Sequence, residues 1–177
     1  MPSVCIRRGS TGLTSVAPAF RFGLLVALIV FAADQALKWY LLGPFALAGK
    51  GRVHLMPSVD LVLVWNRGIS YGLFQQYGVG RWLLVAVSVA AIVVFTIWML
   101  RAGNRFYAAA LGLVIGGAAG NLLDRLVFGA VVDFMSLYWG DFEWYVFNIA
   151  DAAIVAGVAG LLYDSIFRSH TRAANGA

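Results

Sequence analysis

The sequence predicts an all-α integral membrane protein with four transmembrane helices and a small extracytoplasmic β-element in the loop between the first two. Three observations predict this class. Of the 177 residues, 62% are hydrophobic and only 12% are charged, and the mean hydropathy is +0.84. Four apolar stretches are long enough to cross a hydrocarbon core of about 30 Å as helices. Too few charged residues remain to cover a soluble core, so lipid is expected to be the solvent for most of the surface.

The predicted membrane spans alternate across the bilayer and leave short tails at both ends. The first span follows several arginines, as a secretory signal peptide does, but Asp34 and Lys38 interrupt it and no small-residue cleavage site follows, so we expect a retained helix. We expect one domain, residues 20–167, with a flexible N-terminal tail, 1–19, and a flexible C-terminal tail, 168–177. The predicted spans are residues 20–42, 82–100, 106–127 and 146–167.

The distribution of charge predicts the orientation. Lys and Arg divide almost evenly between the two sides, but all acidic residues except Asp164 fall on the outer side, which leaves a net charge of +6 inside and −1 outside. This asymmetry predicts that both termini are cytoplasmic. It also accounts for the overall charge of +5. No basic cluster is interleaved with exposed aromatics, so we expect no nucleic-acid partner.

The loop at residues 43–81 contains the predicted β-element. Residues 59–65 are rich in β-branched and aromatic side chains, which favours a strand that ends at the turn formed by Asn66, Arg67 and Gly68. Aromatic residues then follow towards the second span and suit a membrane interface. A plain connector with an interfacial aromatic belt is the alternative interpretation of this loop. The aromatics are Tyr71, Phe74 and Tyr77.

Small residues recur at four-residue spacing in the third and fourth spans. Gly112, Gly116 and Gly120 share one face of the third span, and the fourth span carries Ala152, Ala156 and Gly160 at the same spacing. Such faces let helix backbones approach closely in lipid, where no hydrophobic effect drives helices together. We interpret both as packing seams.

The single cysteine, Cys5, allows no intramolecular disulfide and no thiolate metal cluster.

Polar residues gather at the outer ends of these spans. Asn121, Asp124 and Arg125 lie at i, i+3 and i+4 on one face of the third span, and Asn148 and Asp151 lie three residues apart in the fourth. Close packing of the two spans would bring these faces together.

In the first span, Asp34 and Lys38 lie one helical turn apart and can form an ion pair. We interpret Asp34, Lys38, Asp124 and Arg125 as a buried ionic network that fixes the register of the helices. Ionisable groups within a membrane are costly, so they are usually paired or functional.

Asp133 and Asp151 differ from this set because neither has a basic residue within one helical turn in sequence. They are candidates for a paired-carboxylate site, since two close carboxyls in a low-dielectric setting share a proton and supply an acid and a base together. Such a pair can hydrolyse an amide. An ion-coupled transporter that uses Asp34, Asp124 and Asp151 remains an alternative, although no inverted repeat is found. A non-catalytic membrane scaffold remains another.

Five blocks of the sequence, in order, resemble the lipoprotein signal peptidases, the type II signal peptidases of bacteria. The resemblance extends over about residues 20–167. The sequence departs from the family's usual pattern in a longer N-terminal tail. It also departs at Ile69 and Ser70, where small alanines are common, and substrate preference is the property that this second change would alter. The blocks are residues 34–38 (DQALK), 66–72 (NRGISYG), 116–125 (GGAAGNLLDR), 131–134 (VVDF) and 147–151 (FNIAD).

The resemblance implies an intramembrane aspartyl endopeptidase of the bacterial inner membrane, with its active site towards the extracytoplasmic face. It implies that Asp133 and Asp151 are catalytic. The implied substrates are diacylglyceryl-modified prolipoproteins, cleaved just before the lipidated cysteine, and the implied inhibitors are cyclic peptide antibiotics. No metal or organic cofactor is implied, and membrane lipids are the other expected partners. The residues implied to bind substrate or to orient the aspartates are Asn66, Asn121, Arg125 and Asn148.

Overall fold

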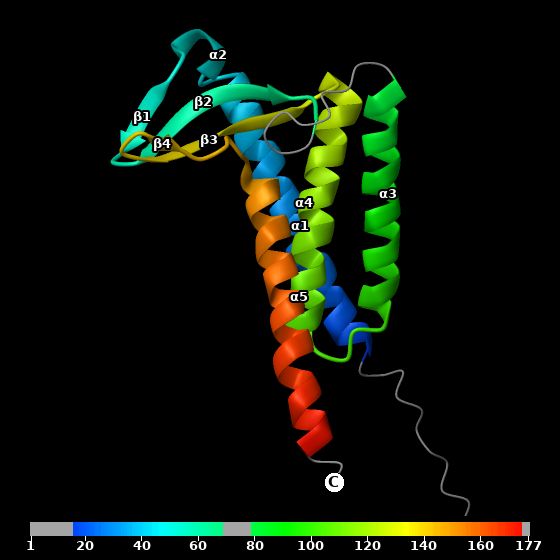
Figure 1. Cartoon of the computed structure of the whole chain (residues 1–177). Coiled ribbons are helices and arrows are strands. Elements are labelled where there is room, and N and C mark those ends of the chain that lie inside the picture. The colour runs from blue at the N-terminus through cyan, green and yellow to red at the C-terminus, as the bar shows by residue number, and fades with distance from the viewer. Residues whose placement is uncertain (1–15, 69–78, 175–177) are drawn as a thin grey trace, which may run out of the picture.

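The computed structural model describes residues 16–68 and 79–174, with side chains described for 18–68 and 80–167. Figure 1 shows the long helices side by side, with a small sheet across one end. Residues 69–78, which contain the predicted interfacial aromatics and the departures at Ile69 and Ser70, lie outside the described part. The elements are α1 (Val16–Leu42), α2 (Leu47–Lys50), β1 (Val53–Met56), β2 (Val59–Asn66), α3 (Val79–Leu100), α4 (Arg105–Phe128), β3 (Val131–Trp139), β4 (Phe142–Glu143) and α5 (Ile149–Ala174).

The four predicted membrane spans are confirmed. Within the described residues, four helices are long and apolar enough to cross a membrane. The fourth begins at Ile149, three residues later than predicted, because Asn148 caps it. It continues as helix to Ala174, into the segment predicted as a tail. The spans are Pro18–Leu42, Gly80–Leu100, Arg105–Phe128 and Ile149–Phe167.

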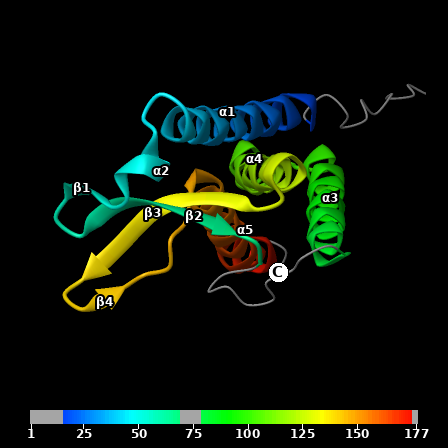
Figure 2. The ribbon, with the colours of Figure 1, turned by 90° about the horizontal axis from the view of Figure 1, so that it is seen from above.

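Helix α4 is the centre of the bundle and contacts α1, α3 and α5 (Figure 2). Its glycines allow this close approach. A Cβ on Gly116 would lie 2.5 Å from the carbonyl oxygen of Ala27 in α1, whereas one on Gly117 would overlap the backbone of Ala150 in α5. Successive helical residues point about 100° apart, so adjacent glycines serve different neighbours.

The small-residue faces therefore do not pair as a single seam between α4 and α5. Gly112 and Gly116 face α1. From α5 it is Gly157 and Gly160 that approach α4, both against Ala110. The spacing of small residues predicted which faces pack closely, but not which helix each face meets.

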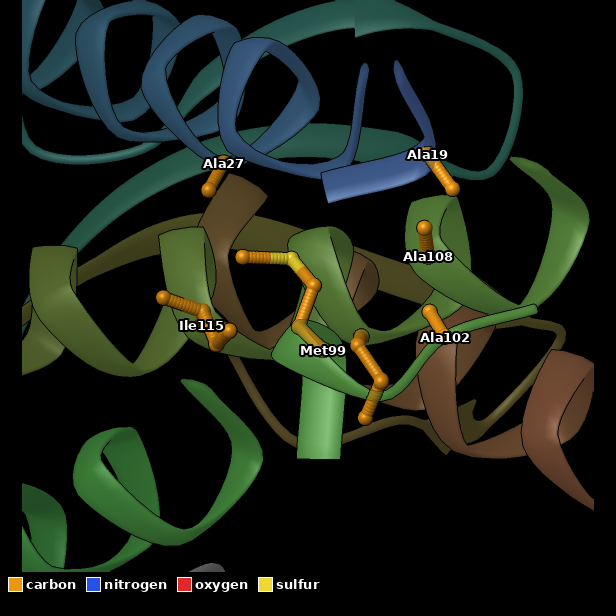
Figure 3. Packing of buried hydrophobic residues seen from close by; sticks show 7 residues of the cluster. Ala19, Ala27, Met99, Ala102, Ala108 and Ile115 are labelled. Atoms are coloured by element: carbon orange, nitrogen blue, oxygen red, sulfur yellow. The ribbon is translucent and has the colours of Figure 1, made fainter. Parts of the chain in front are cut away.

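A cluster of buried side chains, four of them alanines, packs between α1, α3 and α4 (Figure 3). Met99 of α3 lies among alanines of α1 and α4 and is only 1% exposed. Alanine lets the backbones approach, and the long thioether side chain fills the remaining space. The buried members are Ala19, Ala27, Met99, Ala102, Ala108, Leu111 and Ile115.

The β-element is larger than the sequence predicted. Strand β2 is the predicted strand, but it pairs with β3, which follows α4, and the antiparallel order is β1-β2-β3-β4. Residues 131–139 contain valines and aromatics suited to a strand, and sequence reasoning left them as a connection. The pairing of Asn66 with Val131 and of Val64 with Asp133 brings the two outer loops together. The sheet thereby holds Asp133 at the outer end of the bundle.

We predict that Gly116→Ala weakens the contact between α1 and α4. The added methyl would lie 2.5 Å from the Ala27 carbonyl oxygen and 2.9 Å from Val30 Cβ, so the helices must move apart at a cost of about 1–3 kcal/mol. Thermal unfolding in detergent measures the change. Gly103→Ala is the matched control, because a Cβ there meets nothing within 4 Å. Equal melting temperatures for the two variants would contradict this account of the seam.

Candidate active site

Asp133 lies on β3 and is 1% exposed. Both of its carboxylate oxygens accept hydrogen bonds from asparagine side chains. Asn66, the last residue of β2, donates from Nδ2 to Oδ2 at 3.0 Å, and Asn148 donates from Nδ2 to Oδ1 at 2.7 Å. Strand pairing and the start of α5 together fix the orientation of this carboxyl group.

Asp151 is the third residue of α5 and forms a reciprocal capping box with Asn148. The backbone N–H of Asp151 donates to Asn148 Oδ1 at 2.9 Å, and the backbone N–H of Asn148 donates to Asp151 Oδ2 at 3.3 Å. Asn121 of α4 donates from Nδ2 to Asp151 Oδ1 at 2.8 Å. The carboxylate is thus held at a helix N-terminus, where a negative charge is stabilised by the helix dipole.

Asn148 connects the two aspartates. It donates to Asp133, exchanges backbone and side-chain hydrogen bonds with Asp151, and also donates from Nδ2 to Asn121 Oδ1 at 3.1 Å. Residues from a strand, a helix start and a helix interior therefore converge on one site. The structure brings together the two aspartates that the sequence analysis paired, with Asn66, Asn121 and Asn148 in direct contact with them.

A buried ionic cluster lies directly behind this site. The ammonium of Lys38 lies 2.7 Å from Asp34 Oδ2 and 2.7 Å from Asp124 Oδ2, with all three side chains at most 3% exposed. Lys38 Nζ also donates to Asn121 Oδ1 at 3.4 Å. Gln35 joins the acids by donating from Nε2 to Asp34 Oδ2 at 3.1 Å and to Asp124 Oδ1 at 3.0 Å.

Each acid of the cluster holds the residue that precedes one of the paired aspartates. Asp34 Oδ1 accepts the backbone N–H of Ala150 at 3.0 Å, and Asp124 Oδ2 accepts the backbone N–H of Val132 at 3.1 Å. The cluster therefore positions the backbone at both halves of the site. Sequence reasoning missed Gln35, although a third polar residue between Asp34 and Lys38 was the available signal.

Arg125 lies at a cavity rather than beside Lys38. Its Nη1 donates to the carbonyl oxygen of Asn121 at 3.4 Å, and its side chain lines a cavity of about 270 Å³ between α3, α4 and α5. Asp151 lines the same cavity, so this carboxylate is accessible to a water-sized molecule. The lining residues are Asn66, Gly68, Val87, Ser88, Ala91, Ala118, Asn121, Arg125, Val131, Tyr145, Asp151 and Ile154.

Burial, and next the nearby charge of Asp151, raise the pKa of Asp133 from 3.8 to about 7. Close to neutral pH this carboxyl group can therefore either hold or release its proton. A protonated and an ionised carboxyl can then coexist at the site, as acid–base chemistry requires.

In the described part of the chain, no three His, Cys, Asp or Glu side chains gather as metal ligands.

The fold and the site define a polytopic membrane protein in which two aspartates, bridged by Asn148, lie beside a cavity. Residues 26–167 match the model of the family described as Signal peptidase (SPase) II. The match covers most of the chain, so the protein belongs to the signal peptidase II family. Members of this family are proteases.

Relatives agree with this assignment, and a solved structure shares the fold. A lipoprotein signal peptidase of Methylorubrum extorquens (strain PA1) is 56% identical over 149 residues, which are 84% of this chain and 87% of the relative. One from Methylobacterium radiotolerans is 53% identical over 83% of this chain and 86% of the relative. A solved structure described as a bacterial membrane enzyme has a TM-score of 0.71 at 23% identity, covering 81% of this chain and 89% of the other. The similarity to this solved structure shows a shared fold and nothing more.

We predict that Lys38→Met destabilises the protein strongly. Removing the ammonium leaves Asp34 and Asp124 buried without their cation, and breaking a buried ion pair in this way costs about 3–5 kcal/mol. The control is Lys50→Met, because Lys50 is exposed and lies 4.1 Å from the Phe45 ring centroid, a contact worth about 0.5–1 kcal/mol. Thermal unfolding in detergent compares them. A small and equal loss in both variants would show that the cluster is not a structural requirement.

We also predict that Asp133 makes stability fall as pH rises. Its folded pKa of about 7 exceeds the ordinary value of 3.8, so between these values the folded state keeps a proton that the unfolded state has lost. The free energy of unfolding contributed by this group therefore decreases from about pH 4 to pH 7. Melting temperatures across this range should show a flatter profile for Asp133→Asn than for wild type. Parallel profiles would contradict the prediction.

Proposed function

We propose that this protein is an intramembrane aspartyl endopeptidase that removes signal peptides from diacylglyceryl-modified prolipoproteins, cutting just before the lipidated cysteine. The observation that carries the proposal is the position of Asn148, which contacts both Asp133 and Asp151 and holds them at one site. Membership of the signal peptidase II family and the names of the relatives supply the substrate class.

In the proposed mechanism Asp151 is the base and Asp133 is the acid. Asp151 lines the cavity, and its ionised form takes a proton from water as the water oxygen attacks the scissile carbonyl carbon. Asp133, deeply buried and protonated, supports the carbonyl oxygen as negative charge develops there. The C–N bond then breaks, the proton passes to the leaving amine, and the water oxygen remains on the new carboxyl group of the signal peptide.

The other polar residues orient the reacting groups in this proposal. Asn66 and Asn148 each hold one oxygen of Asp133, and Asn121 holds Asp151. Arg125 lines the cavity as a fixed cation, suited to a substrate carbonyl oxygen. Cyclic peptide antibiotics are the class of inhibitor that we expect to occupy the same cavity.

We propose a location in the bacterial inner membrane with both termini cytoplasmic and the site towards the extracytoplasmic face. The start of α1 and the end of α5 lie at the end of the bundle away from the sheet (Figure 1), and the net positive charge that the sequence predicts for this end supports the orientation. A lipidated cysteine could then keep its acyl chains in the outer leaflet while the scissile bond reaches the cavity from the side.

We predict that Asp133→Asn and Asp151→Asn each lower cleavage by about 10²–10⁴-fold, the usual contribution of a positioned acid or base. Asparagine preserves the shape of the side chain but cannot transfer the proton. Cleavage of a diacylglyceryl-modified prolipoprotein in detergent, followed by gel shift, measures the loss. Asp141→Asn, at an exposed position in the turn after β3, is the matched control and should cleave normally.

Thermal unfolding of the same samples separates loss of chemistry from loss of fold. Asp124→Asn should lower the melting temperature, because Asp124 accepts the backbone N–H of Val132 and pairs with Lys38. Folded Asp133→Asn or Asp151→Asn protein that still cleaves would refute the catalytic assignment. Wild-type protein that cleaves no prolipoprotein would refute the peptidase proposal and leave ion-coupled transport as the alternative.

A further inference from the structure

A second cavity lies at the opposite end of the bundle from the aspartates. It has a volume of about 260 Å³ and is lined by Trp98, Arg101 and Tyr107, where α3 ends and α4 begins. Figure 1 shows this connection at the far end from the sheet, near the start of α1. None of its residues takes part in the site described above, so the cavity needs a separate explanation.

The polar groups of this cavity are available to a ligand. Among the described residues, the guanidinium of Arg101 forms no hydrogen bond or ion pair, and the hydroxyl of Tyr107 forms no hydrogen bond. The backbone of Tyr107 is fixed, because its N–H donates at 2.9 Å to Oδ1 of Asn104, the residue that caps α4. A guanidinium and a tyrosine side chain that line one cavity suit an anion with several acceptor oxygens, and a phosphate group fits that description best.

The cavity is also continuous with a surface that faces lipid. Ile97 is 44% exposed, Trp98 47% and Leu100 50%, and α3 packs against the bundle chiefly through α4. Trp98 is held in place by an edge-on contact with Phe95 at 5.6 Å between ring centroids. A ligand whose phosphate binds Arg101 would therefore extend its remaining atoms along an apolar helix face. Only the acyl chains of a lipid would be stabilised by that contact.

We propose that this cavity binds the phosphate headgroup of a phospholipid from the inner leaflet, with Arg101 and Tyr107 on the phosphate and Trp98 against the glycerol and the start of an acyl chain. Trp and Tyr are enriched at this depth because their rings have an apolar body and a polar edge. The assignment to the inner leaflet rests on the orientation given under the proposed function. Binding itself is independent of the peptidase activity.

Native mass spectrometry of the full chain in detergent, titrated with dioleoylphosphatidylglycerol, tests the proposal. We expect Arg101→Gln to weaken lipid binding about tenfold, because it removes a charge-assisted hydrogen bond, and Tyr107→Phe to weaken it by a smaller factor. The matched control is Arg105→Gln, which removes the same charge four residues away. Arg105 lies 5.9 Å from the Phe22 ring and does not line the cavity.

Three outcomes would overturn the proposal. Equal losses for Arg101→Gln and Arg105→Gln would show that the lipid is attracted only by the general positive charge of this end of the bundle. Dioleoylglycerol lacks the phosphate. If it binds as tightly as the phospholipid does, Arg101 has no role in recognising the headgroup. Full competition by inorganic phosphate would indicate a free-anion site. Because no peptide substrate is present, each result stands whether or not the protein cleaves prolipoproteins.

Discussion

The buried ammonium of Lys38 is the group on which the rest of the site depends. It lies between two carboxylates that come from different helices, and its loss would leave both acids buried without their cation. Each acid uses a further oxygen lone pair to hold a backbone N–H, one at the start of α5 and one at the start of β3. A single cation thus joins α1, α4, α5 and the sheet.

The same low dielectric that makes this cluster costly also acts on Asp133, one of the two aspartates proposed to be catalytic. Burial is the main reason that the pKa of Asp133 rises to about 7. The two sets of acids differ in their partners: Asp34 and Asp124 face an ammonium, whereas Asp133 and Asp151 face the amide groups of asparagines. Amides orient a carboxyl group without neutralising it, so this pair can still exchange a proton.

The close approach of the helices makes these distances possible. Gly120 of α4 has no side chain to separate it from Asp34, whose Oδ2 would lie 2.6 Å from an added Cβ. Gln35 also donates to the carbonyl oxygen of Gly120 at 3.2 Å. Small residues in lipid are often discussed as a means of packing. Here they also let polar side chains of α1 reach those of α4.

The sequence by itself determined the membrane class, the four spans and the residues able to carry the chemistry, because apolar run length and ionisable groups within it are local properties. It could not determine that β3 pairs with β2, that Gln35 joins the acids, or that Arg125 lines the cavity instead of the Lys38 cluster. Those features depend on which helix each face of α4 meets. That choice is made by packing between segments distant in the chain, and only the tertiary structure decided it.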